Sequence, residues 1–241
     1  MIDHPIHDYS LEGYDFPDGK GEGRYTGALE LMKRYPGRFN VLRMTGLFDI
    51  CWHLTGIQDI MIALMDEEDF ANEVLDLATE YMINVISSAP PEIDAIRFNE
   101  DWGAQNALMI SRNTWKEYLE PRLRRIHAAT RKKGFFVMHH SCGNITDLFP
   151  DLIDLGVDII DPIQPEAMNI AFLKREYGKD IILFGGLGAQ STLPCGTPQD
   201  VIKEVKETIA LLGRGGGCIT GPAGSISTDT PLDNVIALAE F

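Results

Sequence analysis

Short apolar runs alternate with longer amphipathic segments along most of this chain. Between the apolar runs, apolar positions recur with the helical period over residues 66–87, 111–133 and 198–212. Strands that alternate with helices predict a parallel sheet with helices outside it. The six runs that we predict as strands span residues 39–45, 95–99, 135–140, 159–162, 181–185 and 218–221.

Polar side chains directly follow several of these predicted strands. They are Asn99, Glu100 and Asp101, then His140, Ser141 and Cys142, and further along Gln164 and Gln190. Six parallel strands could form an open doubly wound sheet, but polar groups at many carboxyl ends favour a (β/α)8 barrel. We therefore predict an α/β fold of the TIM-barrel type that is incomplete, with about six βα units.

Length and composition indicate a single domain. The 241 residues are 44% hydrophobic, which is enough for one core, and residues 1–27 are rich in Asp, Gly, Pro and His, which predicts an N-terminal arm or loop. The net charge of −15 disfavours binding to nucleic acid or to an anionic membrane surface. We see no apolar run long enough to span a membrane, and four scattered cysteines suit reduced thiols, so we expect a cytoplasmic protein.

The end of the third predicted strand carries the most informative residues. Successive side chains of a strand point to opposite faces, so His140 and Cys142 project to the same side and His139 to the other. Imidazole nitrogen and thiolate sulfur are ligands that zinc prefers. The pair predicts half of a zinc site, although a buried cysteine beside a hydrogen-bonded histidine is the alternative.

Other polar positions near strand ends have two interpretations each. Glu100 and Asp101 could serve as acid, base or metal ligand, or one of them could cap the following loop. Trp102 could form a pocket wall or belong to the core. Gln105, Gln164 and Gln190 could orient a polar substrate or satisfy the backbone of their loops.

An ordered set of motifs identifies a family. The motifs include Asp101-Trp102-Gly103-Ala104-Gln105, His140-Ser141-Cys142-Gly143, Asp161-Pro162-Ile163-Gln164-Pro165, Gly185-Gly186-Leu187-Gly188-Ala189-Gln190, Gly215-Gly216-Gly217 and Asp229-Thr230-Pro231-Leu232-Asp233-Asn234. Together the motifs cover about residues 38–240 and resemble the uroporphyrinogen decarboxylase superfamily, which also holds zinc-dependent methyltransferases that work with corrinoid proteins.

The resemblance implies a ligand set for zinc. In the methyltransferase branch a His-x-Cys pair and a later cysteine hold the metal, which here implies His140, Cys142 and Cys218. Cys218, however, follows three glycines at the start of its predicted strand, and at ~3.3 Å per residue it would lie more than ~10 Å from the strand's carboxyl end. Glu100 or Asp101 is therefore the alternative third ligand.

Three functional hypotheses remain open. The first is a zinc-assisted methyltransferase that acts on a small molecule together with a corrinoid protein. The second is uroporphyrinogen decarboxylase itself. Two observations count against it, because arginine is scarce at the strand ends and no Arg-rich N-terminal segment occurs. The third is a non-catalytic shortened paralogue that binds a ligand or partner. Because an incomplete barrel exposes sheet edges, we also expect a homo-oligomer, a partner chain that completes the barrel, or a chain that is a fragment.

Overall fold

The computed structural model describes residues 4–241, which divide into two compact units. Of the described residues, unit 1 comprises 4–100 and Ile110–Met138, and unit 2 comprises Asp101–Met109 and His139–Phe241. The first three residues of the predicted N-terminal arm lie outside the described residues. The remainder of the arm forms turns and loops until helix α1 begins at Thr26, and the single-domain organisation stays a prediction.

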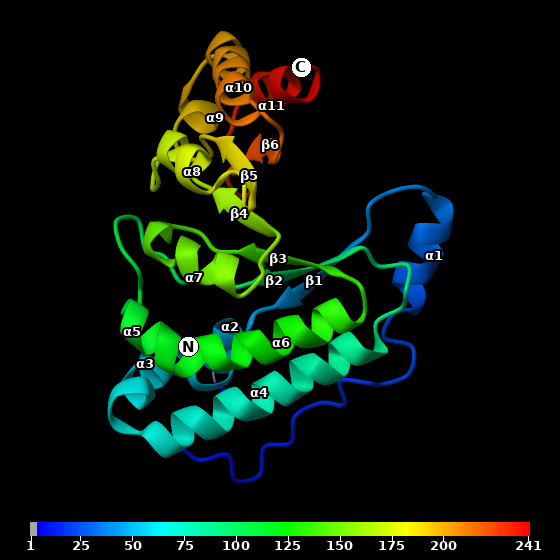
Figure 1. The fold of residues 1–241 in the computed structure, drawn as a ribbon, viewed down its shortest axis with the longest axis vertical. Helices are drawn as coiled ribbons and strands as arrows, with labels where there is room; N and C mark the ends of the chain where they lie inside the picture. The colour runs from blue at the N-terminus through cyan, green and yellow to red at the C-terminus, as the bar shows by residue number, and fades with distance from the viewer. Residues whose placement is uncertain (1–3) are drawn as a thin grey trace. The chain divides into compact units, whose positions relative to one another are not determined.

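All six predicted strands are confirmed, and they form a parallel sheet (Figure 1). The strands follow one another in the sheet in sequence order. A doubly wound sheet would reverse its order at a switch point, so this arrangement is that of consecutive βα units in a barrel. The strands are β1 (Val41–Thr45), β2 (Ala95–Asn99), β3 (Phe136–His140), β4 (Ile159–Ile163), β5 (Ile182–Leu187) and β6 (Cys218–Pro222).

The helices of unit 1 include the two long ones that the sequence predicts. The segment predicted as one helix over 111–133 is interrupted by a π-helical turn, and the Ser111 hydroxyl caps its start by accepting a hydrogen bond from the Thr114 N–H. The helices are α1 (Thr26–Arg34), α2 (Leu47–Thr55), α3 (Ile57–Asp66), α4 (Glu68–Ser88), α5 (Arg112–Thr114), the π turn η1 (Trp115–Leu119) and α6 (Glu120–Lys132).

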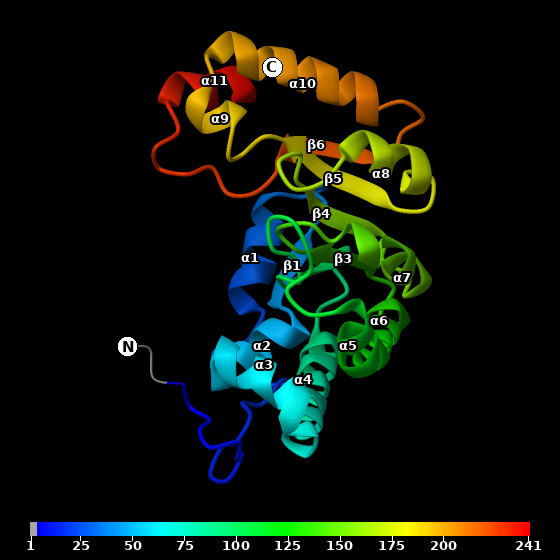
Figure 2. The ribbon, with the colours of Figure 1, turned by 90° about the vertical axis from the view of Figure 1, so that its left-hand side faces the viewer.

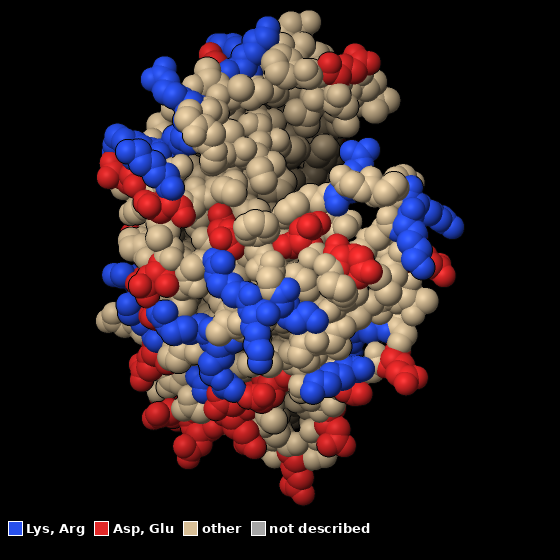
Figure 3. Space-filling view, turned by 45° about the vertical axis from the view of Figure 1, so that its right-hand side comes forward, with Lys and Arg blue, Asp and Glu red and all other residues tan. Residues whose placement is uncertain are grey.

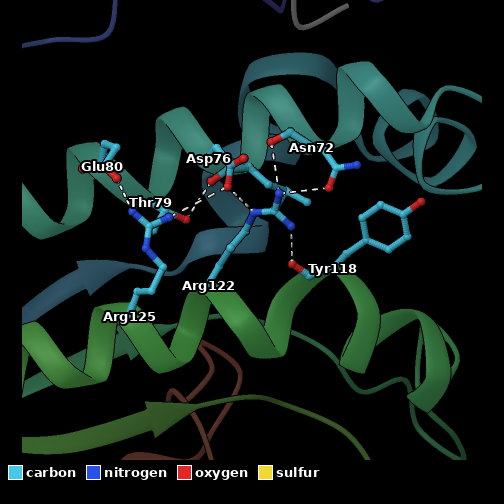
Figure 4. A network of polar contacts seen from close by, with 8 residues as sticks. Asn72, Asp76, Thr79, Glu80, Tyr118, Arg122 and Arg125 are labelled. Carbon is cyan, nitrogen blue, oxygen red and sulfur yellow. Dashed lines mark hydrogen bonds and ion pairs between the residues drawn. The ribbon is translucent and has the colours of Figure 1, made fainter.

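A buried arginine joins α4 to α6 inside unit 1 (Figure 4). Arg122 of α6 donates to the Asp76 carboxylate at 2.7 Å and to the Asn72 side-chain oxygen at 2.9 Å, both on α4. It also donates to the Tyr118 carbonyl at 2.7 Å. Hydrogen bonds to a charged group are stronger than neutral ones, so this side chain holds the two helices in one register.

Oppositely charged side chains line the exposed side of the same helix pair. Arg125 of α6 pairs with Glu80 of α4, and its guanidinium lies 4.0 Å from Asp76. On the face drawn in Figure 3, Lys and Arg groups lie beside Asp and Glu groups. The exposed side of this helix pair thus carries charges of both signs.

In unit 2, helix α10 packs closely on β5 (Figure 2). Gly186 of β5 adopts a φ of +87°, and a Cβ there would lie 2.9 Å from side-chain carbons of both Leu212 and Thr208. The helix starts at a capping box formed by Thr197 and Asp200. The helices of this unit are η2 (Thr146–Leu148), α7 (Phe149–Asp154), α8 (Ile170–Tyr177), α9 (Thr192–Cys195), α10 (Pro198–Leu212) and α11 (Leu232–Ala239).

Burial differs between the middle and the ends of the strand order. Every residue of β4 is buried, as expected of a strand in a parallel sheet with covered faces. In contrast, three of the five residues of β1 are exposed, and β6 has one exposed and four partly buried residues; Val41 and Ile219 have 43% and 42% of their surface accessible. The two strands at the ends of the order are therefore the least covered.

No single helix among the described residues is long and apolar enough to cross a membrane. Only α2 and α3 taken together pass the length and composition test, and they are bent by 106° at the break between them.

Candidate metal centre

A tight loop carries Asp101 from the end of β2. The Met109 N–H donates to the Trp102 carbonyl and the Ala104 N–H to the Ala107 carbonyl, so residues 102–109 fold back on themselves. Trp102 is fully buried, and its ring stacks on His139 with centroids 5.1 Å apart. Trp102 thus anchors the loop directly after Asp101, which is the first candidate ligand along the chain.

The end of β3 separates its two histidines as the strand alternation predicts. His139 is fully buried against Trp102, whereas His140 is partly exposed. Cys142 lies two residues beyond His140, and its Sγ atom is 3.6 Å from the His140 Nε2 atom. Two ligands bound at ~2.0 and ~2.3 Å to a tetrahedral zinc ion would lie roughly 3.5 Å apart, so this separation suits the metal.

Asp101 completes a group of three potential ligands. Its Oδ1 atom lies 4.0 Å from His140 Nε2, and one ligand atom from each of Asp101, His140 and Cys142 lies within 4.8 Å of the others. The same Oδ1 accepts a hydrogen bond of 2.8 Å from the Cys142 N–H, which holds the carboxylate beside the thiol. Nitrogen, sulfur and oxygen donors in this arrangement fit zinc.

Asp161 of β4 orients the imidazole of His140. The His140 Nδ1 atom lies 3.2 Å from the Asp161 Oδ2 atom, and Asp161 is only 5% exposed. A carboxylate that accepts the Nδ1–H bond fixes the tautomer with a free lone pair on Nε2, as behind many zinc-bound histidines. In the sequence Asp161 stands out only as part of a motif. The signal that could have revealed its role is a carboxylate on the strand that follows a His-x-Cys strand end.

Two glycines let the loops after β2 and β3 touch. A Cβ on Gly143 would lie 2.4 Å from the Gly103 carbonyl oxygen, and one on Gly103 would lie 2.6 Å from the Cys142 carbonyl oxygen. Gly143 also has a φ of +76°, a conformation that favours glycine. The backbone contact, reinforced by an Asn144 N–H to Ala104 carbonyl bond of 2.8 Å, brings Asp101 to Cys142.

Glu100, the other predicted carboxylate, is engaged in unit 1. It is 1% exposed, and its two oxygens accept hydrogen bonds from the Leu47 and Phe48 N–H groups at the start of α2. Gly46 makes this approach possible, because a Cβ there would lie 1.5 Å from the Glu100 side chain. Glu100 therefore caps the start of α2, whereas the capping role that the sequence suggested for one of these carboxylates was toward the following loop.

The three predicted glutamines occupy different positions in unit 2. Gln164 is buried and its side-chain oxygen accepts from the Gly143 N–H at 3.3 Å. Gln164 and Gln190 both line a pocket beside Cys142. Gln105 instead donates to the Glu166 carbonyl at 2.9 Å. Roles for the three glutamines and for Trp102 in substrate binding stay predictions.

The remaining cysteines are not members of the group of three that the described residues form. Cys218 is the first residue of β6 and is paired in register with Leu183 near the start of β5, at the amino end of the strands. Cys51 is fully buried in α2, and burial raises the pKa of its thiol. Among the described residues, Asp101 is thus the third potential ligand that geometry brings to His140 and Cys142.

A comparison with family models decides the classification. The model of the family described as uroporphyrinogen decarboxylase (URO-D) matches residues 18–241. The chain belongs to the uroporphyrinogen decarboxylase family. The superfamily expected from its motifs is therefore confirmed.

Curated relatives within this group are named as methyltransferases. The methylated-thiol–coenzyme M methyltransferase of Methanosarcina mazei is 26% identical over 209 residues, which cover 86% of this chain and 54% of the relative. The methylcobamide:CoM methyltransferase MtaA of Methanosarcina barkeri is 27% identical over 198 residues, or 81% of this chain and 55% of the relative. The chain thus spans about half the length of the curated relatives that it matches.

A solved structure confirms the fold of this URO-D family chain. A methyltransferase from Methanosarcina mazei superposes with a TM-score of 0.81 at 23% identity, covering 99% of this chain and 70% of that one. At this identity the match speaks for the barrel-type fold alone. The named relatives favour the methyltransferase branch over the decarboxylases, as the His-x-Cys motif predicted.

Proposed function

We propose that this protein is a zinc-assisted methyltransferase that moves a methyl group between a small thiol and the corrinoid of a partner protein. The observation that carries the proposal is the group of Asp101, His140 and Cys142, with Asp161 behind the imidazole. The names of the curated relatives supply the reaction class, the thiol and the cobamide.

In this proposal each residue has a defined task. His140 and Cys142 bind zinc, and Asp101 supplies the oxygen ligand while it is held by the Cys142 N–H. Asp161 keeps the imidazole in the tautomer that binds metal. Bound zinc would lower the pKa of a coordinated substrate thiol, so that the thiolate is available as nucleophile near neutral pH.

The two alternatives have less support. A decarboxylase must hold a substrate with several carboxylates, yet no Lys or Arg is among the described residues that line the pocket beside Cys142. A non-catalytic paralogue would have no need of three donor side chains converging within 4.8 Å. We also place the protein in the cytoplasm in this proposal, because its four cysteines are all free thiols.

Zinc content is the decisive measurement. Elemental analysis of protein purified without chelator should find about one zinc per chain, because structural and catalytic zinc sites bind tightly. His140→Ala and Cys142→Ser should lose the metal. Cys195→Ser should keep it, because this exposed cysteine of α9 lies outside the group.

Two further variants identify the third ligand. If Asp101 binds zinc, Asp101→Ala lowers the zinc content and Cys218→Ser leaves it unchanged. The reverse result would give the ligand role to Cys218. Absence of zinc from the parent protein would refute the metal mechanism and leave the decarboxylase and the non-catalytic paralogue as alternatives.

A further inference from the structure

The pocket beside Cys142 has walls from the segments that follow four strands of the sheet. Its volume is about 390 Å³, which is at the small end of the range for ligand pockets. Cys142 lies on one side, Gln164 and Gln190 follow β4 and β5, and Ser225, Ser227 and Asp229 follow β6. Of the three candidate metal ligands Cys142 lines this pocket, and the volume is sufficient for a small thiol.

The lining of this pocket mixes apolar and polar residues, and its charge is of one sign. Asp229 is its carboxylate, and no Lys or Arg is among the described residues that line it. The Ser227 hydroxyl donates a hydrogen bond to Asp229, and this bond lowers the pKa of the carboxyl group. Asp229 is therefore ionised at neutral pH and available to a cation.

The neutral side chains of the pocket add hydrogen bonds without changing its charge. The Gln164 oxygen is already occupied by the Gly143 N–H, so its amide offers the NH₂ group as donor. The hydroxyls of Ser225 and Ser227 can donate or accept. None of these groups supplies the positive charge that a sulfonate or carboxylate substrate would need.

Building on the proposed function, we propose that this pocket takes a small thiol whose other end is a protonated amine. The sulfur lies toward Cys142 and the ammonium group toward Asp229. A thiol with an anionic end, such as the sulfonate of coenzyme M, meets a like charge there and binds less tightly. The substrate class of this protein thus differs in charge from the coenzyme M that its curated relatives are named for.

Binding of three thiols of similar length to Co²⁺-loaded protein tests this selectivity. The probes are 2-aminoethanethiol, 2-mercaptoethanol and 2-mercaptoethanesulfonate, and sulfur-to-cobalt absorption bands report their binding. Because the thiols differ in acidity, the quantity compared is the ratio of Kd between the parent protein and Asp229→Asn for each thiol. Asp233→Asn, which removes the same charge from α11 outside the pocket, is the matched control.

We expect Asp229→Asn to change the Kd of the two charged thiols in opposite directions. Asp229→Asn should weaken 2-aminoethanethiol about two- to five-fold, the range for an exposed ion pair, and should tighten the sulfonate by a similar factor. The neutral thiol should change little, the control variant should match the parent, and the effect should shrink in high salt.

Two outcomes would overturn the proposal, and they are distinguishable. Uptake of Co²⁺ with the same Kd ratio for all three thiols would refute the charge selectivity and leave the metal site intact. Failure of the parent protein to bind Co²⁺ at all would refute the metal site and the proposed function together with this inference.

Discussion

At the scale of single residues, His140 offers its Nε2 atom because Asp161 holds its Nδ1 atom. Asp101 is likewise held by the Cys142 N–H, so two of the three potential ligands are oriented by hydrogen bonds before any metal binds. Groups that are already oriented lose less conformational entropy on binding. Groups that hydrogen-bond to the potential ligands, such as the Asp161 carboxylate, therefore contribute to metal affinity together with the ligands themselves.

Asp161→Asn tests this orienting role. The amide accepts a weaker hydrogen bond from the imidazole than the carboxylate does, so we expect zinc affinity to fall by about 10- to 100-fold. Competition with a chromophoric chelator measures the change. Asp147→Asn, an exposed aspartate of η2 in the same unit, is the control, and equal affinities for both variants would contradict the role.

At the scale of elements, the strands and the long helices follow from the periodicity of apolar positions. β2 and α10 begin and end as predicted, and the other strands differ from their predicted bounds by one or two residues. The π turn Trp115–Leu119 was not predicted, because a shift to i→i+5 bonding leaves the apolar stripe almost unchanged. Helix pairing also depends on side chains such as Arg122 that periodicity does not describe.

Arg122→Ala should destabilise unit 1. The change removes the charged hydrogen bonds to Asp76 and Asn72 and leaves the Tyr118 carbonyl without this donor, at a cost of about 2 kcal/mol in the free energy of unfolding. Urea denaturation measures it. Arg124→Ala removes the same charge from an exposed position on α6 and should cost less than about 0.5 kcal/mol, so similar losses for both would argue against the network.

At the scale of the whole molecule, the order of the strands decides the architecture. Consecutive neighbours from β1 to β6 exclude the doubly wound alternative, and the match to the Methanosarcina mazei structure agrees with a barrel-type fold. β1 and β6, at the ends of this order, expose residues such as Val41 and Ile219. Exposed strand edges are templates for pairing with other chains.

We therefore predict that the chain self-associates in solution. Light scattering after size-exclusion chromatography should give a mass of at least twice the 26.8 kDa of one chain. Introducing a charge by Ile219→Lys should lower the proportion of the larger species, because charged side chains discourage edge pairing. A monodisperse monomer with cooperative unfolding would contradict this prediction.

The sequence by itself determined the alternation of strands and helices, and the projection of His140 and Cys142 to the same side. Both follow from local rules, namely the apolar period and the two-residue repeat of a strand. Tertiary structure decided which of Glu100 and Asp101 is a potential metal ligand, because the side chains of neighbouring residues point toward different surroundings. Glu100 meets the start of α2, while the close backbone contact of Gly103 with Gly143 brings Asp101 to Cys142. That contact joins segments distant in the chain, so no local pattern could specify it.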